Sequence, residues 1–511
     1  MTTKSNFYYF IALLVVGIFL GYLSVLPKSP ESTHTWRQSD CAAIAKNYYR
    51  SDLKFFQPRL YNRQEGEGYM VGEFTGTYFL AAVFYKVFGV HDGILRGIHL
   101  TIFLFGMLSL MKVAYAFLQD RFLSYFAGLL FFSFPVLAYY GSNFLPDAPA
   151  FGFLMAGWAS FMRHYQTGDS KSWWWAVGFF TLAGLLKITF LMSVGALGFL
   201  WFLEAACKVK IEDRLIFKNP IRSFIGFMVI LFFVGMWYVF SIKYNKHHES
   251  TYFLNATYPV WSGENMDYFV YTFFRTVFFW SKYYFFPGLA FMFLFLIPYV
   301  LIFGKPVLKG FHYGMVLITF AGAIAIWLLW YYQFTDHDYY IIGIYPFFFF
   351  LTIGALKMLK ENHPATLKNI RIKVILVVFL LINLVYAKYT MNDRYEGKLA
   401  YKPNPVLSQP DFKTFLSGIG IHKDTKVISI PDSSPNTTLH QLDLPGFTEW
   451  KDTKRNRISV ERVQHFIDLG AQFMIVHDPA SYDKEYVKSY SDSLAGQFQD
   501  VKVYSLSSYF K

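Results

Sequence analysis

Asp40 is the first residue of this sequence whose type and position suggest a reaction. It ends the stretch His34-Thr35-Trp36-Arg37-Gln38-Ser39-Asp40, which groups an acid, a guanidinium, an amide and an indole directly after the first hydrophobic segment. Such a group beside a bilayer predicts a reaction site at the membrane surface, with Arg37 and Gln38 as candidate substrate ligands. The alternative is that Asp40 caps the helix that follows it.

Two further ionisable residues, Asp147 and Lys187, stand at the ends of hydrophobic segments. Asp147 lies in Pro146-Asp147-Ala148-Pro149, and Lys187 interrupts an apolar run. A charge that is buried unpaired in a membrane is costly, so both residues are functional candidates. Each also has a structural explanation, because Asp147 with Pro149 makes a good helix start and Lys187 can extend its amine to the surface. A lone cation among apolar side chains is also well suited to a phosphate.

The last cluster of candidates is Thr335-Asp336-His337-Asp338-Tyr339-Tyr340. Two acids flank a histidine, but the spacing matches no closed zinc site. The sequence therefore predicts that His337, Tyr339 and Tyr340 bind a sugar or a phosphate, with ordinary loop chemistry as the alternative. Glu73 adds an acid to the first polar loop and is a further candidate ligand.

The elements that must position these side chains are transmembrane helices. Of the 511 residues, 54% are hydrophobic and 16% are charged, and the apolar residues fall in runs of about twenty, which is typical of a polytopic membrane protein. Hydropathy predicts eleven spans, at 7–27, 94–117, 121–140, 149–163, 172–187, 188–206, 222–243, 284–303, 310–333, 341–359 and 371–390.

The segment 74–89 is apolar but shorter than a span, and it contains Lys86, so we expect it to lie in the membrane interface. The basic loops then fall on the same side as the N-terminus, which the positive-inside rule makes cytoplasmic. The first polar loop, 28–93, and the other candidate residues share the opposite face. The net charge of +13 indicates anionic lipid as a partner and not nucleic acid.

The tail 391–511 differs from the transmembrane module 1–390, because it has no long apolar run. Short strand-like and helix-like segments alternate in it, which predicts a small soluble α/β domain on the extracytoplasmic side. Strands are expected at 426–430, 472–476 and 501–504, and helices at 460–469 and 485–494.

The order of these motifs resembles the GT-C glycosyltransferases, in particular the branch of bacterial protein O-mannosyltransferases and aminoarabinose lipid A transferases (glycosyltransferase family 39). The resemblance covers about residues 1–390. It is carried by the first-loop acid Asp40, a surface helix between Gly72-Glu73-Phe74 and Phe88-Gly89, Arg96, Pro146-Asp147-Ala148-Pro149, Leu185-Leu186-Lys187, and His337-Asp338-Tyr339-Tyr340.

The resemblance implies an inverting transferase of a bacterial inner membrane that moves a sugar from a polyprenyl-phosphate carrier to an extracytoplasmic hydroxyl of a protein, a lipid or a glycan. Asp40 would be the general base or would orient the acceptor, Asp147 the second acid near the reaction centre, and Lys187 the cation near the donor phosphate. His337 with Tyr339 or Tyr340 matches the late motif near that site. Phosphate leaves readily, so no metal is required, although a divalent ion could assist.

A transporter or flippase for a lipid or glycan is the alternative from another class. Transporters place polar residues near the middle of the bilayer and often have duplicated halves, whereas the acids singled out here lie at helix ends. A scaffold whose tail binds a partner would explain the tail but not the acids. Catalysis also requires that Asp40 and Asp147 face one extracytoplasmic cavity.

Overall fold

The computed structural model describes residues 3–63, 67–213, 215–250, 257–263, 265–308, 310–397, 401–450 and 458–509. It is mostly helical, and the chain divides into two compact units. We call them the helical unit (Met1–Pro27, Arg96–Tyr238 and Ala256–Asp393) and the loop–tail unit (Lys28–Leu95, Val239–Asn255 and Arg394–Lys511).

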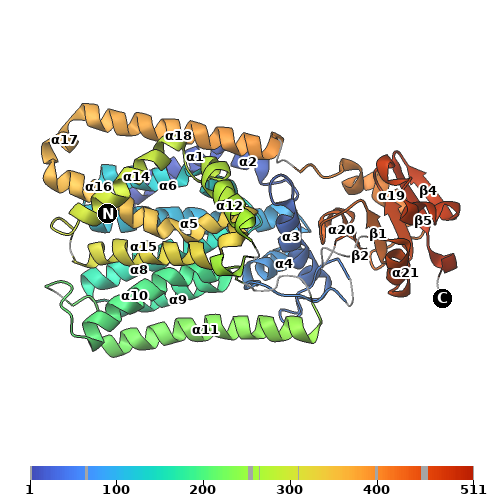
Figure 1. Ribbon diagram of the computed structural model, residues 1–511, viewed down its shortest axis with the longest axis horizontal. Helices are drawn as coiled ribbons and strands as arrows, with labels where there is room; N and C mark the ends of the chain where they lie inside the picture. Colours follow the sequence, from blue (N-terminus) through green and yellow to red (C-terminus); the bar gives the residue numbers. More distant parts are fainter. Residues whose placement is uncertain are drawn as a thin grey trace. The chain divides into compact units, whose positions relative to one another are not determined.

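Helices account for nearly all of the helical unit (Figure 1). In chain order they are α1 (Thr3–Leu20), α2 (Tyr22–Val25), α5 (Asp92–Leu118), α6 (Arg121–Phe132), α7 (Pro135–Tyr140), α8 (Asp147–Thr167), α9 (Ser170–Leu186), α10 (Leu191–Trp201), α11 (Pro220–His247), α12 (Met266–Phe274), α13 (Ser281–Tyr284), α14 (Pro287–Phe303), α15 (Gly310–Leu329), α16 (Tyr345–Asn362), α17 (Pro364–Lys368) and α18 (Ile370–Glu396).

A helix lies in each of the eleven predicted ranges, which confirms the polytopic class. Two predicted spans are broken: Gly21, at φ 98°, ends α1, and Pro135 begins α7 after α6 has ended at Phe132. Six of the described helices are long and apolar enough to cross a membrane by themselves, and the bent pair formed by Met266–Tyr284 and Pro287–Phe303 would make a seventh. The count falls below eleven because helices such as α9, with 17 residues, span only about 26 Å.

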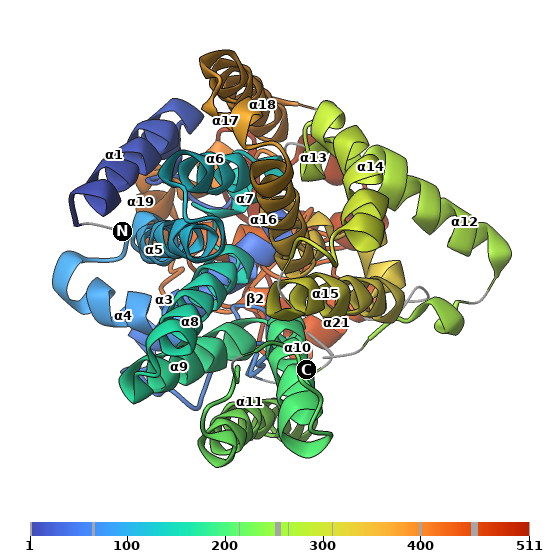
Figure 2. The same cartoon turned by 90° about the vertical axis from the view of Figure 1, so that its left-hand side faces the viewer.

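Small residues let the helices that carry the candidate residues approach closely. A Cβ atom on Gly106 of α5 would lie 2.1 Å from the Cα of Gly152 on α8, so only glycine fits there. Close backbone contact of this kind is a common way for helices to pack within membranes. Helix α8 also packs along α9, and α16 packs against α6, α14 and α15, as the end view in Figure 2 shows.

The loop–tail unit contains a five-stranded sheet and short helices. The helices are α3 (Thr35–Arg50), α4 (Gly76–Phe88), α19 (Pro410–Gly418), α20 (Thr437–Leu442), α21 (Val460–Asp468) and α22 (Glu485–Lys488), and the strands are β1 (Val427–Ile430), β2 (Gly446–Phe447), β3 (Phe473–Val476), β4 (Leu494–Phe498) and β5 (Val501–Ser505). The strand order is β2-β1-β3-β5-β4, in which β1 runs parallel to β2 and β3, and β5 runs antiparallel to β3 and β4.

The structure confirms three strands of the predicted tail domain and corrects one helix. The predicted helix 485–494 is wrong after Lys488, where α22 ends. Leu494 instead begins β4, which pairs with β5 in a hairpin that contains an irregularity at Gly496. The main-chain hydrogen bonds of this hairpin outweigh the helical spacing of the side chains. The segment 74–89 forms α4, whose 13 residues span about 20 Å, too little to cross a membrane core of about 30 Å.

The first loop, predicted with the transmembrane module, packs against the tail in this unit. The Arg63 N–H donates to the carbonyl of Gly446 (2.7 Å), and the Gly446 N–H donates to the carbonyl of Tyr61 (3.0 Å). These bonds extend the sheet at the edge strand β2 and leave that edge paired. The Asn62 amide also donates to the carbonyl of Pro435 and to the Thr448 hydroxyl.

Polar contacts of Asp92 and Arg50 also join the first loop to the tail. Lys46 Nζ lies 3.4 Å from one oxygen of Asp92, and His440 Nε2 lies 3.5 Å from the other. Arg50 pairs with Asp443 at 2.7 Å. The Asp92 carboxylate is buried and would lose compensation for its charge without these partners, so its contacts hold the first loop against the tail.

Gly446 offers a direct test of this joint. A Cβ atom there would lie 1.8 Å from the carbonyl oxygen of Val427, so Gly446→Ala must displace main chain that both β1 and the first loop use. We expect a lower Tm and faster limited proteolysis within the loop and the tail. The matched control is Gly418→Ala, where a Cβ meets nothing within 4 Å. Equal stability of the two variants would contradict the role of this joint.

Candidate functional site

Helix α3 holds Asp40 within its length and not at its start. The helix begins at Thr35, and His34 occupies the N-cap position with a left-handed backbone at φ 59°. The alternative in which Asp40 caps this helix is therefore wrong. Asp40 follows Arg37 by three residues on the helix, a spacing that places the two side chains on one face.

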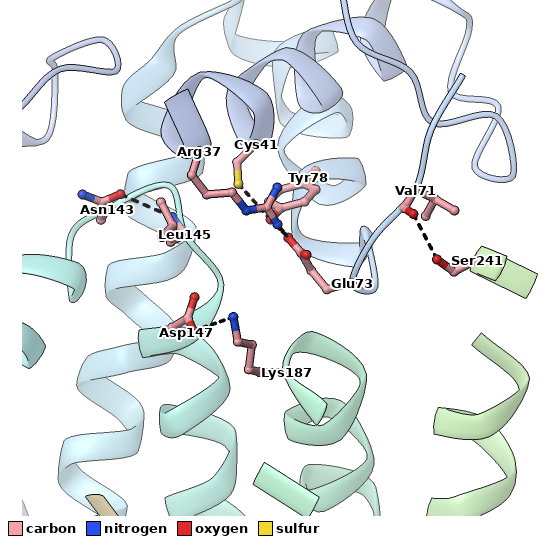
Figure 3. A network of polar contacts seen from close by, with 10 residues as sticks. All are labelled: Arg37, Cys41, Val71, Glu73, Tyr78, Asn143, Leu145, Asp147, Lys187 and Ser241. Carbon is pink, nitrogen blue, oxygen red and sulfur yellow. Dashed lines mark hydrogen bonds and ion pairs between the residues drawn. The ribbon is translucent and has the colours of Figure 1, made fainter. Parts of the chain in front are cut away.

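A chain of polar contacts starts from Arg37 (Figure 3). The Arg37 guanidinium forms an ion pair with Glu73 Oε1. The Tyr78 hydroxyl donates to the same oxygen at 2.9 Å and lies 3.1 Å from Cys41 Sγ. Three separate parts of the first loop, namely α3, the segment before α4, and α4 itself, thus meet at one carboxylate.

The end of α11 sets the backbone just before Glu73. The Asn245 amide accepts a hydrogen bond from the Val71 N–H (2.8 Å) and donates one to the Val71 carbonyl (2.7 Å). The Ser241 hydroxyl donates to the same carbonyl at 3.0 Å (Figure 3). A residue 170 positions away along the chain thereby fixes the segment from which Glu73 projects.

Asp40 is the exceptional acid of this cluster, because it is 2% exposed and no described residue hydrogen-bonds its Oδ1. Burial raises the pKa of Asp40 to about 7, the cation of Arg37 lowers it, and the carboxylates of Glu73 and Asp432 raise it further. A carboxyl with this pKa exchanges a proton near neutral pH, which is the property that a general base requires.

The tail contributes residues beside Asp40 that the sequence analysis missed. Asn436 Nδ2 donates to the carbonyl of Ser39 at 3.3 Å. Asp432 accepts hydrogen bonds from the main chain and hydroxyls of Ser434 and Thr438, so its own position is fixed. In the sequence these residues form a stretch rich in Ser, Asn, Thr and Pro, which by itself predicts only a turn.

Gln38 has contacts that hold the loop. Its amide donates to the carbonyls of Glu31 (2.7 Å) and Thr33 (2.9 Å), and the side chain is buried. These bonds fix the chain that leads into α3. A contact between Gln38 and substrate stays a prediction.

In the helical unit, Asp147 and Lys187 form an ion pair of 3.0 Å (Figure 3). Asp147 is the first residue of α8 and is buried, so the predicted helix start is confirmed. Lys187 follows the last residue of α9 in an extended conformation, before a short 3-10 helix at Ile188–Phe190. Lys187 therefore pairs with an acid, in contrast to the alternative in which it only extends toward the membrane surface.

The motif His337-Asp338-Tyr339-Tyr340 lies beside Lys187. The Lys187 ammonium is 5.0 Å from the ring centre of Tyr339 and 4.5 Å from that of Tyr340. Both tyrosines belong to the 3-10 helix Asp338–Gly343. His337 packs on both rings. The Tyr140 hydroxyl, which the sequence analysis did not single out, donates to Asp338 at 2.7 Å. Four of the predicted residues in this unit therefore lie together around one cation: Asp147, His337, Tyr339 and Tyr340.

Helix α5 fixes the turn that presents Asp147. The Arg96 guanidinium donates to the carbonyl of Ser142 (2.8 Å) and lies 4.3 Å from the ring centre of Phe144. His99 Nδ1 lies 3.0 Å from the carbonyl of Asn143. Both basic side chains are fully buried. Arg96 thus acts as a positioning residue for the turn, and it is one of the residues that carried the family resemblance.

The polar residues around Asp40 in the loop–tail unit and those around Lys187 in the helical unit differ in the ligand that they can bind. In the parts of the chain that the structure describes, no three His, Cys, Asp or Glu side chains are grouped as metal ligands. The Lys187 ammonium and the tyrosine hydroxyls can bind a phosphate group. The buried Asp40 carboxyl can accept a proton from a hydroxyl.

Stability provides a test of the unusual state of Asp40. Its folded pKa of about 7 lies above the ordinary 3.8, so the folded chain holds more protons than the unfolded chain and loses stability as the pH rises from about 4 to 7. Asp40→Asn removes this loss, which is on the order of 4 kcal/mol at most. We expect the variant to have a higher Tm than the native protein at pH 8 and a similar Tm near pH 4.5.

The control for this test is Asp411→Asn, which changes an exposed acid of the same unit. It should leave the pH dependence of Tm unaltered. A native-like pH dependence in Asp40→Asn would show that Asp40 is ionised at little cost, contrary to its burial.

No family sequence model matches the chain, and no curated protein sequence does. Solved structures share its fold. ArnT from Cupriavidus metallidurans in the apo state is 12% identical, with a TM-score of 0.60 over 98% of each chain. The apo oligosaccharyltransferase of Archaeoglobus fulgidus is 12% identical, with a TM-score of 0.53 over 93% of this chain and 70% of that one. The arabinofuranosyltransferase AftD from Mycobacteria is 10% identical, with a TM-score of 0.56 over 99% of this chain and 40% of that one.

All three structures are GT-C glycosyltransferases. The chain therefore has the GT-C fold, as the resemblance implied: a polytopic helical membrane protein with a small sheet domain near its C-terminus. Identity this low shows the fold alone.

Proposed function

We propose that this protein is a membrane glycosyltransferase that moves a sugar from a polyprenyl-phosphate carrier to an acceptor hydroxyl, with inversion of the anomeric centre. Asp40 is the general base. The observation that carries the proposal is the state of this residue: a buried carboxyl without a hydrogen bond to Oδ1 and with a pKa of about 7. Purely structural acids are usually paired, and an acid poised near neutral pH is suited to take a proton from an attacking hydroxyl.

The proposed sugar transfer needs no reactant besides the donor and the acceptor. The acceptor oxygen forms a bond to the anomeric carbon while the bond from that carbon to the phosphate oxygen breaks, and the acceptor proton passes to Asp40. The phosphate leaves with the electron pair of the broken bond. Negative charge grows on that phosphate, and a preorganised cation stabilises it most in the transition state.

Lys187 is the cation that we assign to the donor phosphate. Its ion pair with Asp147 and its place over Tyr339 and Tyr340 hold the ammonium in one position. In this proposal Asp147 orients Lys187, and the tyrosine hydroxyls donate to phosphate oxygens. Arg37 and Glu73 adjust the proton affinity of Asp40. None of these steps needs a metal, although the donor phosphate could bring a divalent ion with it.

The similar structures support a lipid-linked donor and an acceptor outside the cytoplasm, since they include ArnT, a lipid A transferase, and an oligosaccharyltransferase studied with an acceptor peptide. We infer that this protein lies in a bacterial inner membrane with its N-terminus in the cytoplasm and its tail outside. The acceptor hydroxyl belongs to a protein, a lipid or a glycan.

The first test distinguishes the role of Asp40 from that of Lys187. The purified protein is given polyprenyl-phosphate-linked pentoses and hexoses in detergent, and the release of polyprenyl phosphate is measured. Asp40→Asn should lower kcat by roughly 10²- to 10⁴-fold, the usual contribution of a general base, with little change in the KM for the donor. Lys187→Met should lower kcat and also raise that KM, because it removes a contact to the phosphate.

The control is Asp52→Asn, which removes an exposed acid of the same loop whose ion pair with Lys86 is at the surface and contributes little. It should retain native activity. An unchanged kcat in Asp40→Asn would rule out Asp40 as the base. Movement of intact lipid-linked sugar across proteoliposomes without release of polyprenyl phosphate would favour a flippase instead.

The second test uses the charges around Asp40. As a base Asp40 must be ionised, so activity should rise with pH through about 7. Arg37→Gln removes a cation that lowers the pKa of Asp40, and the rise in activity should move to higher pH. Glu73→Gln removes a carboxylate that raises this pKa, and the rise should move to lower pH. Shifts of the pH profile in the same direction would contradict the assignment.

A further inference from the structure

A pocket of about 450 Å³ lies in the helical unit among α1, α5, α8 and α9. Two cations, Lys112 and Arg163, line it together with the polar side chain of Asn6. The apolar part of its lining includes Phe105 and Phe179. The pocket contains none of the residues discussed above for sugar transfer.

The pocket lies at the opposite end of the helices from Asp147 and Lys187. Arg163 follows Asp147 by sixteen residues on α8, which is roughly 24 Å along the helix axis. Lys112 is near the last residue of α5, and Trp175 is near the start of α9. Helix termini that carry a tryptophan and basic residues are typical of the headgroup region of a bilayer.

The polar groups of the pocket can accept a ligand. No carboxylate among the described residues forms an ion pair with Lys112 or Arg163. Asp169 interacts electrostatically with Arg163, but its own carboxylate accepts from the Lys171 main chain and the Ser172 hydroxyl. Asn6 Oδ1 is buried, and no described residue hydrogen-bonds it.

We infer that this pocket binds an anionic phospholipid with a hydroxyl-bearing headgroup, such as phosphatidylglycerol. Lys112 and Arg163 bind the phosphate, since each basic residue near a headgroup favours an anionic lipid by about 1 kcal/mol. The headgroup hydroxyls lie beside the polar side chains of the pocket lining, among them Asn6 and Ser109. The acyl chains leave over Phe105, which is 42% exposed, and Trp175, which is 64% exposed.

Native mass spectrometry of the full-length protein tests this inference without reference to sugar transfer. The protein is equilibrated in detergent with phosphatidylglycerol or phosphatidylcholine, and the bound lipid is counted. The double variant Lys112→Gln/Arg163→Gln should bind phosphatidylglycerol roughly 30-fold more weakly, as expected for the loss of two such contacts. Asn6→Asp keeps both cations and should also weaken binding, because it adds a carboxylate beside the phosphate.

The matched control is Arg121→Gln/Lys171→Gln, which removes the same charge from exposed residues at the same end of the helices, outside the pocket lining. It should bind phosphatidylglycerol like the native protein. Equal binding of the two lipids, or equal weakening by the control and pocket variants, would overturn the inference. So would displacement of phosphatidylglycerol by millimolar inorganic phosphate, because the ligand would then be a free anion.

Discussion

Ionising a carboxyl that is buried without a full set of hydrogen bonds costs free energy. The loop–tail unit buries Asp40 in this way. Helix α3 places Arg37 on the same face as Asp40, but Arg37 is already paired with Glu73. The compensation for the charge of Asp40 is therefore partial. An amide or an apolar side chain would cost less free energy here, so the general base that we propose is kept at the expense of stability.

Asp147 illustrates the opposite solution for a buried acid. Its ion pair with Lys187 compensates its charge, and the tyrosine rings beside that lysine stabilise the ammonium. Two carboxyl groups in one protein thus have different environments: Asp147 has a cationic partner at 3.0 Å, whereas Arg37, the cation nearest to Asp40 along α3, is paired with Glu73.

Membrane-spanning helices explain why the polar groups occur at helix ends. Inside a bilayer the main chain must satisfy its own hydrogen bonds, and a charged side chain within the apolar core needs a partner. The turn before α8, the end of α9 and the 3-10 helix at Asp338–Gly343 are points where a helix stops. Those breaks bring Asp147, Lys187 and Tyr340 together, because only there can main chain and charge be satisfied at once.

The sequence by itself determined the helical membrane class, the approximate positions of the helices and the short helix at 74–89, and it predicted which acids form a site. These follow from local properties, since hydropathy and helix-start chemistry depend on neighbouring residues. It did not determine that Asp40 lies inside α3, that Asn245 fixes the segment before Glu73, or that Asp432 and Asn436 lie near Asp40. Those contacts join residues up to 397 positions apart, and only the tertiary structure decides them, because the energy of a buried charge depends on every group that surrounds it in space.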